Sequence, residues 1–233
     1  MINKIACTAF IVLLISFFTN IAHSKTNYSM LSNDHEVVAK YEHGGKGYSA
    51  ISKDTVGHSY GKWQISTKRV GNHKSTFDLF LIYLKQHNVN YYNQLVKAGG
   101  YDNAYLGTEN FKNVWRKISK EEKFQEIYDD FILETQIKPA YKKFDTNKDL
   151  DKVTSWGSEN QTVQAALHSV IIQHGIGGAY KLVKNTIIIY KPETPEHFVK
   201  CLYDHRTNKF KKYKARYEKE YSDLKLNLND MKG

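Results

Sequence analysis

The spacing of apolar positions predicts a chain built mainly of helices. In several stretches the apolar side chains recur every three or four positions, which places them on one face of a helix. These stretches are residues 36–41, 76–86, 91–97, 119–138, 160–174 and 195–224. Residues 186–190 are strand-like but also fit the end of a helix. No repeat or low-complexity linker divides the chain, so the pattern predicts a single, mainly α domain.

Proline and glycine indicate where these helices end. Pro139 is expected to bend or end the helix over 119–138, because it lacks an amide hydrogen and its ring clashes with the preceding turn. The run Gly175-Ile176-Gly177-Gly178 is expected to stop the helix over 160–174. Residues 44–58 are polar, contain glycine and have no helical period. They predict a loop or a small β-hairpin between the first two helices.

The first 24 residues resemble a cleavable signal peptide. They contain Lys4 near the start, an apolar run and the sequence Ala22-His23-Ser24, which fits the small-x-small pattern at a cleavage point. The apolar run is shorter than the roughly 20 residues that a spanning helix needs, so a retained membrane anchor is disfavoured. We therefore expect export to the periplasm or the medium, with residues 25–233 forming one domain and no stable membrane insertion.

Cysteine content and charge add two constraints. The mature part would contain only Cys201, which excludes an intrachain disulfide and predicts a buried side chain in an apolar helix. Without residues 1–24, which hold one lysine and no acid, 33 basic side chains face 24 acidic ones. Six of the basic residues lie within 209–219. Such a field attracts polyanions, and an exported protein meets wall polymers before nucleic acid.

Two carboxylates are candidates for acid and base chemistry. Glu42 follows the apolar residues Val37 and Val38, and an apolar margin raises the pKa of a carboxylic acid so that it can donate a proton near neutral pH. Asp54 lies twelve positions later in the loop, with Ser59 near enough in sequence to help to orient a water molecule. From the residues alone, Glu42 also fits a surface glutamate at a helix end, and Asp54 fits a solvated turn residue.

The segment around these carboxylates resembles the catalytic segment of lysozyme-superfamily muramidases and chitosanase-like hydrolases. It reads Tyr-Glu-His-Gly-Gly at 41–45 and, after an acid, Ser-Tyr-Gly-Lys-Trp-Gln-Ile-Ser at 59–66. Weaker similarity follows in the same order at 111–115, 164–178 and 202–206. The resemblance covers about 37–224 and implies a lysozyme-like single domain with a hairpin or loop beside the active site.

The resemblance implies roles for several side chains. Glu42 would be the general acid, and Asp54 would match an aspartate that precedes Ser-Tyr-Gly, although the loop 54–58 has less glycine than in the relatives. Tyr60 and Gln64 would line the sugar-binding cleft, and Trp63 would either pack behind the cleft or belong to the core. His174, followed by three glycines within four residues, could contact substrate or brace the Glu42 loop, but it also fits a structural histidine at a helix end.

Other site types are not predicted. His43, His58 and His73 lack the helical pairing of zinc hydrolases, and residues 145–151 lack the glycine and the final glutamate of a calcium loop. No cofactor is expected. The sequence therefore predicts an exported, monomeric hydrolase of the β-1,4 glycan of peptidoglycan or a related amino-sugar polymer. The alternatives are a lytic transglycosylase, a chitosanase, and a non-catalytic module that binds the wall or a polyanion.

Overall fold

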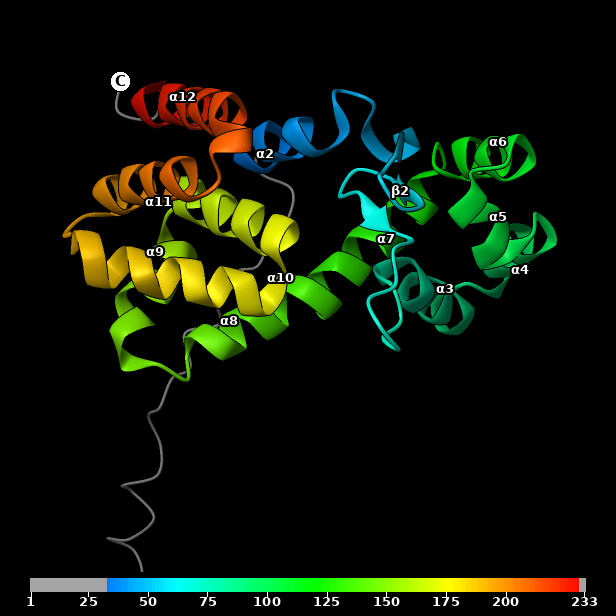
Figure 1. Ribbon diagram of the computed structural model, residues 1–233, viewed down its shortest axis with the longest axis horizontal. Coiled ribbons are helices and arrows are strands. Elements are labelled where there is room, and N and C mark those ends of the chain that lie inside the picture. Colours follow the sequence, from blue (N-terminus) through cyan, green and yellow to red (C-terminus); the bar gives the residue numbers. More distant parts are fainter. Residues whose placement is uncertain (1–32, 231–233) are drawn as a thin grey trace, which may run out of the picture.

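Helices make up most of the described chain, and a small antiparallel sheet lies at one side of the molecule (Figure 1). The computed structural model describes residues 33–230, so the predicted signal peptide lies outside the described part. The arrangement confirms the prediction of a mainly α fold with a small hairpin region.

The helices and strands of the described chain form two lobes. In the order of the chain they are α2 (Asn33–His43), η1 (Gly47–Ser49), β1 (Ile51–Lys53), β2 (His58–Tyr60), β3 (Ile65–Ser66), α3 (Thr76–His87), α4 (Val89–Lys97), α5 (Gly100–Leu106), α6 (Glu109–Ile118), α7 (Glu122–Ile132), η2 (Leu133–Ile137), α8 (Lys138–Phe144), η3 (Lys148–Leu150), α9 (Asp151–Glu159), α10 (Gln161–Tyr190), α11 (Pro195–Lys209), η4 (Lys211–Tyr213) and α12 (Lys214–Asp230).

The smaller lobe contains the sheet and α3 to α6, and the larger lobe contains α8 to α12 (Figure 1). Helix α7 and its continuation through η2 into α8 join the two lobes. Helix α2 packs on α10 and α12 of the larger lobe and leads through η1 into the sheet. In the sheet, β2 lies between β1 and β3, with Tyr60 opposite both Ile51 and Ile65.

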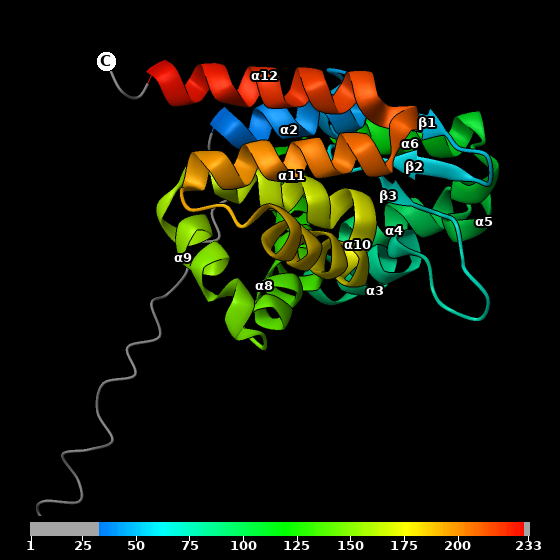
Figure 2. The ribbon, with the colours of Figure 1, turned by 60° about the vertical axis from the view of Figure 1, so that its left-hand side comes forward.

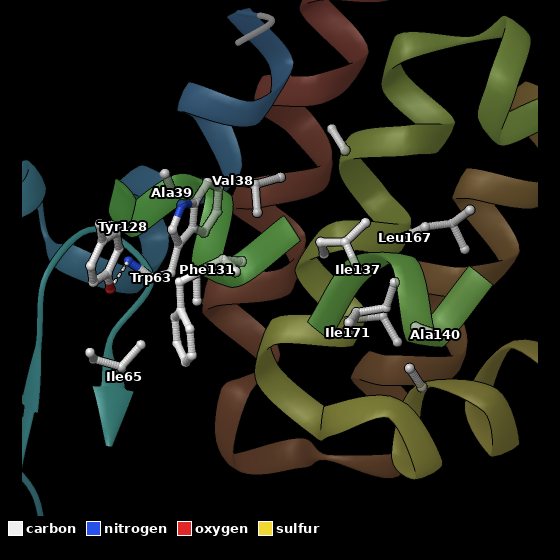
Figure 3. Packing of buried hydrophobic residues seen from close by; sticks show 14 of the residues in the cluster. Val38, Ala39, Trp63, Ile65, Tyr128, Phe131, Ile137, Ala140, Leu167 and Ile171 are labelled. Atoms are coloured by element: carbon white, nitrogen blue, oxygen red, sulfur yellow. Dashed lines mark hydrogen bonds between the residues drawn. The ribbon is translucent and has the colours of Figure 1, made fainter. Parts of the chain in front are cut away.

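An aromatic core holds the sheet against α7. The Tyr128 hydroxyl on α7 donates to the Tyr60 carbonyl at 2.9 Å. It also accepts from the Trp63 amide at 3.1 Å, which is the dashed line between these two residues in Figure 3. Gly61 lies between these two residues with φ of 80°, and a Cβ there would come within 2.6 Å of the Tyr128 ring. The glycine of the Ser-Tyr-Gly motif is therefore required both by its backbone conformation and by the close approach of this ring.

Proline and glycine interrupt two helices close to the predicted positions. Helix α7 ends at Ile132, and the wider π turn of η2 leads into α8, which has Pro139 in its first turn. The helical segment that begins at Gln161 is interrupted at Gly175, whose φ of 65° and ψ of 172° are not helical, as the glycine run predicted. A second helical segment of α10, which was not predicted, follows this kink and runs to Tyr190. Residues 186–190 are therefore helical and not a strand.

Two other expectations concern single features of the chain. Cys201 is a free cysteine on α11 and is 4% exposed, as its apolar surroundings predicted. No helix in the described part of the chain is long and apolar enough to span a membrane.

A buried histidine lies where α2 packs on α10. The ring centroid of His168 is 4.5 Å from that of His35 and 6.0 Å from that of Tyr141. Burial, together with the neighbouring charge of His35, holds the pKa of His168 well below its usual value. His168 is therefore neutral in the folded protein at pH values where the unfolded chain takes up a proton.

This histidine should make the protein sensitive to acid. Because the unfolded state binds the extra proton below about pH 6.5, the free energy of unfolding should fall by about 1.4 kcal/mol per pH unit from this group alone. A His168→Leu variant should lose this part of the pH dependence in urea unfolding at pH 7 and pH 5. The exposed His73→Leu variant serves as control. A wild-type slope in His168→Leu would contradict the prediction.

Candidate active site

Glu42 lies in the last turn of α2, where the larger lobe meets the hairpin. Its side chain is 10% exposed and forms an ion pair with Arg216, which α12 brings alongside α2 (Figure 2). Burial is the main influence on the carboxyl and raises the pKa of Glu42, while the guanidinium of Arg216 opposes this rise. The residue is thus a buried carboxyl with a raised pKa and not a surface glutamate at a helix end.

A second carboxylate, Glu220, lies fully buried one helical turn after Arg216. Its Oε1 accepts hydrogen bonds from Ser169 at 2.5 Å and Tyr203 at 2.7 Å. Its two oxygens are also 3.6 Å from nitrogens of Arg206 and Arg216. Glu220 therefore shares the charge of Arg216 with Glu42 and fixes the position of that arginine from behind.

Arg206 completes this buried group. Its side chain is 0% exposed, and one terminal nitrogen donates to Ser169 at 3.0 Å and Gln173 at 2.7 Å. The guanidinium lies 4.9 Å and 4.3 Å from the ring centroids of Tyr203 and Tyr217. We call Glu42, Ser169, Gln173, Tyr203, Arg206, Arg216, Tyr217 and Glu220 the buried polar network. Its two acids and two arginines balance in charge, which a buried ionic group requires.

Asp54 lies in the turn between β1 and β2, as the hairpin prediction implied. The hydroxyl of Ser59 donates to Asp54 Oδ2 at 2.5 Å, and the Asp54 amide donates to the carbonyl of Gly57 at 3.1 Å. Gly57 has φ of 77°, and a Cβ there would lie 2.3 Å from the Thr67 hydroxyl. The structure thus brings Asp54 and Ser59 together and holds the carboxylate at the tip of the hairpin.

The residues of the hairpin region that were considered for sugar binding, Tyr60, Trp63 and Gln64, have different surroundings in the structure. Tyr60 is 0% exposed, packs against the rings of Phe77, Phe111 and Trp115, and donates from its hydroxyl to the Ala104 carbonyl at 2.7 Å. The expectation that Tyr60 lines a cleft is therefore corrected, because β2 is covered on both faces and leaves this ring in the core.

Trp63 and Gln64 brace the hairpin. Trp63 is 2% exposed, and its indole nitrogen donates to Asp129 at 3.0 Å. Of the two roles considered for Trp63, it therefore has that of a core residue. The amide of half-buried Gln64 accepts from Ser52 at 2.5 Å and donates to the Gly61 carbonyl at 2.8 Å. Both polar atoms of Gln64 are therefore engaged inside the hairpin.

His174 lies at the α10 kink, behind the buried polar network. Its ring stacks on Phe210 with centroids 4.6 Å apart and planes 20° from parallel. Burial lowers the pKa of His174 to about 4, and the positive charges of Arg206, Arg216 and Lys209 add to this effect. The imidazole is neutral at pH 7, and its position fits a role in bracing the network.

Sequence reasoning missed a second buried acid, Asp129 on α7. It accepts from the Tyr48 hydroxyl at 2.5 Å and from the Trp63 indole, and burial raises its pKa. Lys62, 3% exposed, lies 5.3 Å from each of the Tyr48 and Trp63 rings and pairs with Glu36. The local sequence offers no signal for this cluster, because its members come from four separate segments.

The arginine and glutamate behind Glu42 were also missed. A signal existed, because Arg216 and Glu220 are four positions apart, a spacing that pairs opposite charges on a helix. Among residues 33–230, no group of three or more His, Cys, Asp or Glu side chains is placed to hold a metal ion.

The fold that carries these residues is the lysozyme-like, mainly α fold of chitosanases. A GH46 chitosanase of Gynuella sunshinyii in complex with chitotetraose superposes with a TM-score of 0.54 at 14% identity, covering 85% of this chain and 86% of that chain. Another chitosanase complex gives 0.57 at 13% identity, covering 88% and 92%. The native chitosanase of Bacillus subtilis MY002 gives 0.51 at 16% identity, covering 87% and 90%.

The sequence itself identifies the family to which the chain belongs. The model of the family described as type VI secretion system spike protein VgrG3-like, C-terminal, matches residues 35–232, so the chain belongs to this family. A search among curated proteins finds no match.

Proposed function

We propose that the protein is an exported glycoside hydrolase that cleaves the β-1,4 linkages of peptidoglycan, with Glu42 as its general acid. The observation that carries the proposal is the 10% exposed carboxyl of Glu42, whose pKa burial raises, at the junction of the two lobes. Cleavage of a glycosidic bond needs a proton on a poor leaving oxygen, and an acid with a raised pKa can supply it near neutral pH. The chitosanase-like fold supports this chemistry.

Asp54 and Ser59 would supply the second half of the reaction. A carboxylate that already accepts a hydrogen bond from a neighbouring hydroxyl can hold a water molecule and take its proton as the water attacks the anomeric carbon. Ser59 is 5% exposed, so it orients the carboxylate from behind. The two carboxyls belong to different lobes, which suits a glycan bound between them.

The charge of the protein favours an anionic glycan over chitosan. The basic segment 209–219 contains Arg216, the partner of Glu42, and its exposed cations include Lys209, Lys211 and Lys212. A field of this sign repels a cationic polymer and attracts the carboxylates on the peptide stems of peptidoglycan. Chitosan remains the second candidate, because the three similar structures described above are chitosanases.

The site of action would lie outside the cytoplasm. The first 24 residues have the pattern of a signal peptide. The family description names a spike protein of a secretion system, which agrees with a target in the cell wall.

The function can be tested with residues 25–233 and the Glu42→Gln variant. Each is incubated with purified peptidoglycan and, separately, with chitosan, and the products are identified by mass spectrometry. Reducing-end muropeptides from wild type alone would support the proposal, and anhydro ends would indicate a lytic transglycosylase. Cleavage of chitosan alone would indicate a chitosanase. Binding of peptidoglycan without any product would indicate a non-catalytic module.

Asp54→Asn distinguishes the hydrolase from the transglycosylase. We expect peptidoglycan hydrolysis to fall by about 10² to 10⁴, because the amide cannot take the proton of the attacking water. A transglycosylase needs no such base and would keep its rate. The exposed Asp149→Asn variant is the control. An unchanged release of reducing ends by Asp54→Asn would exclude Asp54 as the base.

Arg216→Gln should change the pH dependence of the reaction. Arg216 stabilises the ionised form of Glu42, so its removal should raise the pKa of Glu42 further. Because a general acid acts only while protonated, the alkaline limb of the profile of kcat/KM should move to higher pH. Arg116→Gln, an exposed arginine on α6, is the control. A limb that stays in place or moves to lower pH would contradict this role.

A further inference from the structure

A hollow of about 400 Å³ lies on the smaller lobe beside the hairpin that carries Asp54. Its walls are Val56 of the β1–β2 turn, Arg69 after β3, and Tyr101, Asp102 and Tyr105 of α5. Tyr101 also lines a second hollow of about 460 Å³ that continues over α3 and α4. The two volumes are in the range of small-molecule sites, and Tyr101 lines both.

The aromatic wall of this hollow is fixed in position. The rings of Tyr101 and Tyr105, one helical turn apart, stack with centroids 6.1 Å apart and planes 22° from parallel. The Arg69 guanidinium lies 3.6 Å from the Tyr101 centroid and is held by two hydrogen bonds to Asp78, at 2.8 and 2.6 Å. The Tyr101 hydroxyl donates to the Thr67 carbonyl at 2.8 Å. This support orders the outer ring, Tyr105, before any ligand arrives.

The exposed groups indicate the chemistry of the ligand. Tyr105 is 36% exposed and Val56 is 40% exposed, so the hollow offers a ring and an apolar neighbour. Asp102 is exposed at its edge, and the charge of Arg69 is already paired with Asp78. An anion gains nothing from this arrangement. A cyclic ligand with an apolar face and hydroxyls at its edge fits this hollow. Its apolar face can pack on the ring of Tyr105, and its hydroxyls can form hydrogen bonds with Asp102 and with the Tyr105 hydroxyl.

The hollow is physically joined to the catalytic hairpin. His58 on β2 contacts the Tyr105 carbonyl through its Nδ1 at 3.0 Å. At Gly57, next to Val56, a Cβ would lie 3.0 Å from the Tyr105 ring. The turn that carries Asp54 and the ring of Tyr105 are therefore neighbours.

We propose that the hollow formed by Val56, Arg69, Tyr101, Asp102 and Tyr105 is a distal saccharide-binding site, which holds a sugar residue of the same glycan that is cleaved between the lobes. This proposal rests on the proposed function. Such a site increases the affinity for long chains, because a polymer engages it and the candidate active site together, and it leaves the cleavage of short fragments unchanged.

The test measures binding without cleavage. In a Glu42→Gln background, Tyr105→Ser and Asp102→Ala are compared with the parent by sedimentation with insoluble peptidoglycan. We expect both changes to weaken binding about tenfold, which corresponds to about 1.4 kcal/mol. Ile189→Ser, on the larger lobe and 62% exposed, should bind like the parent. Asp102→Ala alters an exposed residue of α5, so it still tests the site if Tyr105→Ser unfolds.

The second part of the test measures the rates of glycan cleavage. With Glu42 restored, Tyr105→Ser and Asp102→Ala should cleave the polymer with a higher KM and cleave short soluble oligosaccharides at the wild-type rate. Parental binding by both variants, or an equal loss of rate on short fragments, would overturn the distal site. If wild type releases no fragments at all, the proposed function fails, whereas the comparison in the Glu42→Gln background still decides whether the hollow binds glycan.

Discussion

Glu42→Gln is expected to reduce the release of glycan fragments by about 10² to 10⁴ relative to wild type. The amide has nearly the shape of the carboxylic acid but carries no proton acidic enough for the leaving oxygen. Burial already holds Glu42 in the environment that a general acid needs, so the loss should appear in kcat and not in substrate binding. Initial rates on purified peptidoglycan over a series of concentrations measure both quantities.

The control for this variant is Glu218→Gln. Glu218 lies on α12, two residues after Arg216, and its side chain is 57% exposed. Its rate should match that of wild type. Glu42→Gln should also keep a cooperative thermal transition, because Gln can still accept a hydrogen bond from Arg216. A Glu42→Gln protein that is folded and cleaves at more than a tenth of the wild-type rate would exclude Glu42 as the acid.

Arg206→Met should cause the largest loss of stability, about 3 to 5 kcal/mol in the free energy of unfolding. The methionine fills a similar space but leaves Glu220 with only part of its positive partner, and Glu220 is fully buried. The hydrogen bonds to Ser169 and Gln173 are lost as well. Unfolding in urea, followed by circular dichroism, gives the difference directly.

Two comparison variants test this explanation. Arg116→Met removes an arginine whose side chain is 47% exposed, and it should change stability by less than about 0.5 kcal/mol. The double variant Arg206→Met with Glu220→Leu removes the buried charge that the single change leaves unpaired. It should therefore recover part of the loss. If the double variant loses as much free energy of unfolding as the two single variants together, or more, unpaired charge is not the cause.

The buried polar network links stability to the candidate chemistry. Arg216 contacts Glu42 on one side and Glu220 on the other, so the packing of α12 on α2 sets how strongly the acid is held in its ionised form. A change behind the network can therefore alter the pH dependence of the reaction without touching substrate. The comparison of Arg206→Met and Arg216→Gln in rate and in stability separates these two effects.

The sequence alone determined much of the local structure. The period of apolar positions depends only on helix geometry, so it located the helices over 76–86 and 160–174 and the burial of Cys201. Asp54 and Ser59 were paired correctly because five positions separate them and a hairpin turn brings such neighbours together. The segment 41–66 likewise indicated the lysozyme-like fold.

Only the tertiary structure decided the surroundings of the candidate acid. Arg216 is 174 positions from Glu42, and no local pattern shows that α12 packs beside α2. Tyr60 belongs to the core and not to a cleft, since helices of the smaller lobe cover it, and a strand pattern does not tell which face another element will cover. The helical segment that follows the Gly175 kink was not predicted, because packing against neighbours can outweigh the weak helix propensity of glycine. Spacing along the chain fixes the period of an element, whereas burial and charge pairing depend on segments that meet only in the folded protein.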